Sequence, residues 1–202
     1  MLIDYSLEMY ISIAAIIITW AGCFCIIKQD WKHWGPLFLA AAFLGTVLCY
    51  IFVKLHFYSF PYILFIDYVI FPVLVIGHGV PLLVLLGIKY SPTKWSHKIL
   101  FYWVIIIPAM TGETAAHNWT RLIKYELFWD FWDSLTAWWF FLLLFEWIGG
   151  MYIPRHLRRP IPTEAFNFGG WGWLIAHFLM IMGLILAGVY LGMQICRELK
   201  IS

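Results

Sequence analysis

Ionisable side chains that could do chemistry concentrate in one short stretch of this chain, residues 112–133. Glu113 and His117 lie four residues apart, and Arg121 and Lys124 follow at i+8 and i+11. A single helix would carry all four on one face. A carboxylate and an imidazole at this spacing can act as an acid/base pair, relay protons or bind a metal, whereas two basic side chains can bind a phosphate.

Three aspartates join this candidate polar site because of their expected depth in a membrane. A helix rises about 1.5 Å per residue, which puts Glu113 roughly 21 Å beyond Ile99, in the half of the membrane opposite the more basic loops. The expected path of the chain brings Asp67, Asp130 and Asp133 to the same side. The group predicts a polar site that opens to one aqueous side.

These residues also have structural interpretations. Glu113 could pair with His117 or with an arginine and join two helices, since ionisable residues inside spans face a partner, a cavity or the bundle interior. Asp130 and Asp133 could be solvated charges at the interface. Among them, Glu113 lies deepest in an apolar segment and is the strongest functional candidate.

A second polar group, His78, Glu146 and His177, falls nearer the opposite side of the membrane. It could be a second cluster or the lower end of a polar path, because the sequence does not fix how each helix is rotated. His78 lies between two glycines and could make a contact that bends its helix. Glu146 is expected to pair with Arg155 or Arg158.

A resident metal or haem has weak support. The Glu-x-x-x-His pair at residues 113–117 would need Asp67 or His56 as further ligands. For a haem, His78 with His177 is the one pair of histidines at similar depth. We therefore predict no cofactor and no metal.

The composition decides which elements must position these side chains. Hydrophobic residues make up 63% of the 202 residues and charged residues 12%, about half the usual charged content of a soluble domain. Mean hydropathy is +0.84. The apolar segments are long enough to cross a hydrocarbon core of about 30 Å as helices, and too long for barrel strands. They are residues 9–27, 36–53, 62–88, 99–121, 131–152 and 171–196.

The fold class is therefore all-α: one integral membrane domain, 1–202, of about six transmembrane helices. The acidic start of the chain, MLIDYSLE, is unlike the basic start of a signal peptide, so we expect the first segment to be retained. A net charge of +2 gives no reason to expect a nucleic-acid partner. The loops after the first, third and fifth segments are the more basic ones, which favours both termini outside.

Residues 67–147 resemble a family of small, uncharacterised multi-pass membrane proteins of spore-forming Gram-positive bacteria. The resemblance is carried by DYVIFP at 67–72, by Glu113, and by the motif T-x-L-I-K-Y at 120–125 with Trp129 and Trp132 beyond it. The chain departs from the family pattern at His117, where a second acidic residue is expected. The resemblance implies a bacterial cell membrane and no assigned activity.

Three functions remain open from the sequence. The first is a binding or accessory protein that takes a lipid, a small hydrophobic molecule, another membrane protein or a second copy of itself, with Arg121 and Lys124 on a phosphate. The second is a proton-coupled transporter or channel that uses Glu113 and His117. The third is an intramembrane enzyme, metal-dependent or acid/base, built on the same pair.

Overall fold

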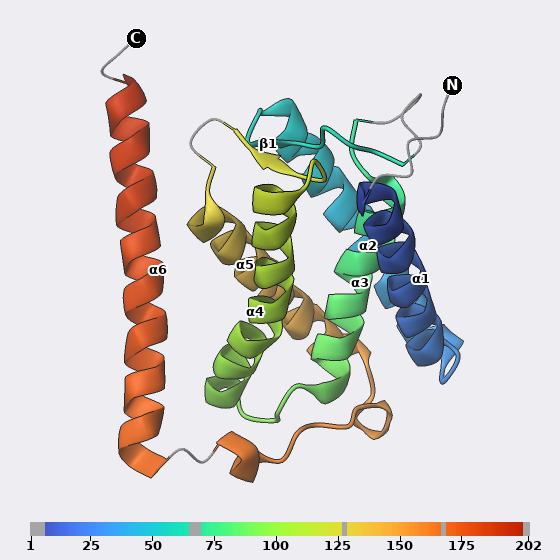
Figure 1. Cartoon of the computed structure of the whole chain (residues 1–202). Helices are drawn as coiled ribbons and strands as arrows, with labels where there is room; N and C mark the ends of the chain where they lie inside the picture. Colours follow the sequence, from blue (N-terminus) through green and yellow to red (C-terminus); the bar gives the residue numbers. More distant parts are fainter. Residues whose placement is uncertain (1–6, 65–69, 127–128, 167–168, 200–202) are drawn as a thin grey trace.

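The computed structural model describes residues 7–64, 70–126, 129–166 and 169–199 and is an all-α membrane bundle (Figure 1). Five of its helices, α1 to α5, are long and apolar enough to cross a membrane, and α6 covers the sixth predicted segment with 31 residues. The helices are α1 Leu7–Ile27, α2 Trp31–Lys54, α3 Val73–Tyr90, α4 Trp95–Trp119, α5 Phe131–Tyr152 and α6 Gly169–Leu199.

The third predicted span was wrong at its start. Helix α3 begins at Val73 rather than at residue 62, and residues 62–64 and 70–72 are not helical. The cause is Pro72, which cannot donate to a helical hydrogen bond and disfavours a helical backbone at Phe71 before it. Asp67, one of the candidate site residues, lies outside the described residues.

The fourth predicted span, residues 99–121, began and ended too late, because α4 runs from Trp95 to Trp119. Thr120 has an extended backbone, and its hydroxyl donates to the Ala116 carbonyl at 2.6 Å. The chain then turns into strand β2, Lys124–Tyr125. Arg121 and Lys124 are therefore not on the helical face that carries Glu113.

A short two-stranded ribbon connects the ends of α2 and α4. Strand β1, Tyr58–Ser59, pairs antiparallel with β2, with Tyr58 opposite Tyr125. The ribbon lies at the same end of the molecule as the start of α1 and the end of α6 (Figure 1). The loop with the two 3-10 turns, Arg155–Leu157 and Thr163–Phe166, lies at the other end.

Helix α3 is the centre of the bundle and packs against α1, α2 and α5, while α4 packs on α5 and α6 lies beside α5. Glycines permit the closest contacts. A Cβ at Gly87 would overlap the Tyr102 ring of α4, and one at Gly149 of α5 would overlap Ile88 of α3. Tyr102 and Ile88 are fully buried, so these contacts hold α3, α4 and α5 together.

Candidate functional site

A cavity of about 870 Å³ lies between helices α1 to α5 and the ribbon. Its wall is mostly apolar, and among the described lining residues Glu113 is the one acidic or basic side chain. Seven aromatic side chains line it: Phe52, Tyr58, Phe60, Trp129, Trp138, Phe140 and Phe141. Of the described site residues predicted from the sequence, Glu113 alone reaches this space.

Small residues on α4 make room for the cavity. Ala109, Gly112, Glu113 and Ala116 all line it, and their spacing of three and four residues places them on one face of the helix. A Cβ at Gly112 would meet no atom within 4 Å. The glutamate is thus the one long side chain on a face that is otherwise nearly flat.

Two hydrogen bonds fix the Glu113 carboxylate. Tyr125 of β2 donates its hydroxyl to Oε1 at 2.8 Å, and Trp138 of α5 donates its indole N–H to Oε2 at 3.2 Å. Burial of the Tyr125 hydroxyl and, next, the negative charge of Glu113 raise the pKa of Tyr125, so the phenol remains a donor at neutral pH. In the described part of the chain, no Lys, Arg or His nitrogen lies within 4.0 Å of the Glu113 carboxylate.

His117 contacts Tyr125, the donor to Glu113. Its ring stacks on the Tyr125 ring, with centroids 4.4 Å apart, and its Nδ1 accepts from the Tyr125 backbone N–H at 3.3 Å. An accepting Nδ1 requires the proton to be on Nε2. His117 therefore positions Tyr125, which in turn holds Glu113, and it is absent from the cavity wall.

The two basic residues predicted to bind a phosphate do not line the cavity. Arg121 pairs with Glu8 of α1, which accepts from both its side-chain Nε and its backbone N–H at 3.2 Å. Lys124 lies 3.8 Å from Glu126, which also accepts the Ser59 hydroxyl. In the sequence, Glu8 belongs to the acidic start MLIDYSLE just before the first predicted segment, and nothing there indicates Arg121 as its partner.

Asp130 and Asp133 cap the start of α5. Asp130 accepts the backbone N–H groups of Trp132 and Asp133, and Asp133 accepts the backbone N–H of Asp130. This reciprocal arrangement satisfies amide groups that a helix start leaves without partners. The structure thus gives both aspartates a structural role, at the entrance to the helix that carries Trp138.

The second predicted group separates into individual contacts. The Nδ1 of His78 lies 2.9 Å from the Leu74 carbonyl of its own helix, and the Nδ1 of His177 lies 2.9 Å from the Trp173 carbonyl. Nε2 of His177 also lies 3.3 Å from the Ser96 carbonyl at the start of α4. Neither histidine shares a partner with Glu146 in the part of the chain that the structure describes.

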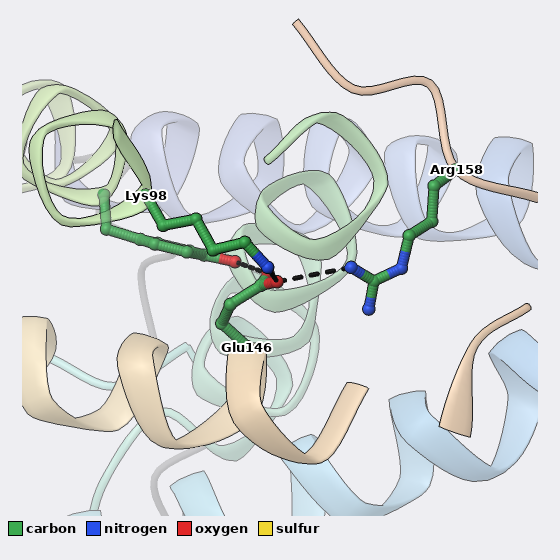
Figure 2. Close-up of polar contacts among 4 residues, drawn as sticks. Lys98, Glu146 and Arg158 are labelled. Carbon is green, nitrogen blue, oxygen red and sulfur yellow. Dashed lines mark hydrogen bonds and ion pairs between the residues drawn. The ribbon is translucent and has the colours of Figure 1, made fainter. Parts of the chain in front are cut away.

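Glu146 is fully buried in the second half of α5 and is the centre of a charged cluster (Figure 2). Lys98 of α4 and Arg158 of the loop after α5 both reach its Oε1, with Arg158 Nη1 at 3.2 Å. Tyr102 donates to Oε2 at 2.6 Å. The pairing with Arg158 is confirmed. Lys98 lies one residue before the predicted fourth segment, residues 99–121, and was not predicted as a partner.

No three His, Cys, Asp or Glu residues come together as metal ligands among the described residues. His56, one of the two further ligands considered, has a left-handed backbone with φ of 57° in the turn after α2. Comparisons with protein-family models, with curated proteins and with solved structures found no match. The family resemblance drawn from residues 67–147 therefore stays a prediction.

Proposed function

We propose that this membrane protein binds a lipid or another apolar small molecule in the cavity beside Glu113, as a binding or accessory component of a bacterial cell membrane. The cavity carries the proposal. Its volume of about 870 Å³ lies within the range of about 300–1,000 Å³ that is typical of ligand sites. A mostly apolar wall with few polar groups is also typical of such sites.

Access from the hydrocarbon core supports a lipid-like ligand. Phe140 and Leu144 of α5 line the cavity and are 62% and 44% exposed, and Ile11 of α1 is 39% exposed. Exposed apolar side chains on the outside of a transmembrane bundle face acyl chains. A ligand dissolved in the bilayer can therefore reach the cavity without crossing water.

The contacts of Arg121 and Lys124 do not support the predicted binding of a headgroup phosphate by these two residues. Arg121 and Lys124 have carboxylate partners, and neither lines the cavity. Glu113 is the charged group that a ligand in the cavity would meet. The relay hypothesis has less support, because His117 binds a backbone amide and the histidines nearer the other end have separate partners.

Filling the cavity tests the proposal directly. Gly112→Leu places a side chain where a Cβ meets no neighbouring atom, on the helix face that lines the cavity. Gly77→Leu is a matched control, because Gly77 is also helical, also has free space around its Cβ, and is absent from the lining. Both changes replace a helix-weakening glycine with a good helix former.

The measurement is native mass spectrometry of the full-length chain extracted in a mild non-ionic detergent. We expect an apolar small molecule or lipid to stay bound to the wild type and to Gly77→Leu, and its occupancy to fall at least tenfold in Gly112→Leu. Equal occupancy in the two variants, at equal melting temperatures, would refute the proposal.

A further inference from the structure

We infer that the ligand of this cavity carries an ammonium group, bound by the Glu113 carboxylate and by aromatic rings of the same cavity wall. This inference rests on the proposed function and names the chemistry of the ligand. It follows from the charge of the cavity wall, from the geometry of the carboxylate and from the aromatic lining.

The described cavity wall holds one acidic side chain, Glu113, and no basic side chain. Three other glutamates, Glu8, Glu126 and Glu146, each have a lysine or arginine within 4.0 Å. Glu113 has no such partner among the described residues, although it lies half-buried beside an apolar cavity. An ionised carboxylate away from water is costly unless it is paired and hydrogen-bonded. A cationic ligand would supply the missing positive charge.

The carboxylate also has room for a third donor. It offers about four acceptor positions, and its two known donors use one on each oxygen, Tyr125 on Oε1 and Trp138 on Oε2. These two bonds come from β2 and α5, so they fix the carboxylate against the wall from two elements. A ligand therefore meets a carboxylate that is already oriented, which lowers the entropic cost of binding.

The aromatic lining favours a cation over a neutral headgroup. Trp138 itself lines the cavity, and Trp129 packs with Phe52 and Tyr58 at ring-centroid distances of 4.9 and 5.9 Å in the same wall. Aromatic faces attract ammonium groups, and tryptophan does so most strongly. A cavity wall that combines a carboxylate with aromatic rings suits quaternary as well as primary ammonium groups.

The same wall disfavours an anionic headgroup. The described lining residues include no lysine, arginine or histidine, so a phosphate placed in the cavity would meet Glu113 with no compensating charge. A phosphate of a zwitterionic lipid would have to remain at the mouth. The two sources of an ammonium are thus a lipid headgroup and a free amphiphilic cation.

Probes with the same alkyl chain and different headgroups distinguish the effect of the ligand's charge from the effect of its shape. The detergent-solubilised full chain is titrated with dodecyltrimethylammonium, dodecanol and dodecyl phosphate, and in a second arm with phosphatidylethanolamine and phosphatidylglycerol, each followed by native mass spectrometry. The variants are Glu113→Gln, which removes the charge at constant size, and Glu164→Gln. The latter is the same change at an exposed glutamate in the loop after α5.

We expect the wild type and Glu164→Gln to prefer the ammonium probe. Glu113→Gln should bind dodecyltrimethylammonium at least tenfold more weakly and leave dodecanol binding unchanged. Selective binding of phosphatidylethanolamine alone identifies a lipid headgroup, and selective binding of dodecyltrimethylammonium alone identifies a free cation.

Two results would overturn the inference, and they differ in meaning. If the three dodecyl probes bind equally and Glu113→Gln changes none of them, the cavity is a ligand site but its ligand is not an ammonium compound. If no probe or lipid binds at all, the proposed function fails as well. Melting temperatures of the variants within a few degrees of the wild type show that the fold is intact in each case.

Discussion

The charged cluster around Glu146 gives a prediction in which a second substitution restores stability. Glu146 is 0% exposed and faces two cations, Lys98 and Arg158, so the buried cluster has one more positive than negative charge (Figure 2). Glu146→Gln keeps the volume and leaves both cations without a counter-charge. Removing one partner of a buried ion pair costs about 3–5 kcal/mol.

Lys98→Met has the opposite effect on the charge balance. It leaves Glu146 paired with Arg158 and with the Tyr102 hydroxyl, so the buried cluster becomes neutral. The expected loss is one charge-assisted hydrogen bond, about 1.5–3 kcal/mol. In the double variant a single cation remains, and the Arg158 side chain is 12% exposed and can shift toward water. We therefore expect the double variant to be more stable than Glu146→Gln alone.

The assay is reversible unfolding in mixed micelles with increasing sodium dodecyl sulfate, which gives a free energy of unfolding for each variant. The expected order of stability is wild type, Lys98→Met, the double variant, then Glu146→Gln. The reasoning is refuted if the double variant is the least stable of the four. That order would mean that lost packing and hydrogen bonds, and not uncompensated charge, determine the effect.

Three further predictions concern single contacts. Asp130→Ala should destabilise the protein by about 1 kcal/mol by removing the cap of α5, measured in the same unfolding assay. Gly149→Ala should cost about 1–3 kcal/mol there, since its Cβ would overlap Ile88. The hydrogen bond from the Ser59 hydroxyl is the largest cause of the lowered pKa of Glu126. The stability that this bond contributes is therefore present above the ordinary glutamate pKa and is lost as the pH falls through the pKa of Glu126 in the folded protein. Ser59→Ala should raise the pKa of Glu126. It should also speed amide hydrogen exchange in the ribbon at neutral pH but not in strong acid. An unchanged Glu126 titration by NMR would contradict this prediction.

Most of the helical architecture was predictable because length and apolarity alone decide whether a segment can cross a bilayer. The fifth segment, residues 131–152, coincides with α5, whose start carries an aspartate cap that is visible in the sequence. The predicted start of the third segment was wrong because hydrophobicity does not show where the backbone can form helical hydrogen bonds. Residues before Pro72 are as apolar as those after it, yet residues 70–72 are not helical and α3 begins only after the proline.

The candidate site was predictable only in its central residue. A carboxylate in an apolar segment is costly wherever it lies, so Glu113 could be singled out without a structure. Its partners could not, because Trp138 lies 25 residues away on another helix and its contact depends on how that helix is rotated. Arg121 was misplaced because no proline or glycine near Trp119 indicates that the helix ends there.

The carboxylates of Glu113 and Glu146 are stabilised in different ways. Glu146 has its charge neutralised by cations from α4 and from the loop after α5, and its surroundings are packed. Glu113 has neutral donors from Tyr125 and Trp138 and open space beside it. Glu8, Glu126 and Glu146 each have a lysine or arginine within 4.0 Å. Glu113 has no such partner among the described residues, and this difference is what the inference of an ammonium ligand rests on.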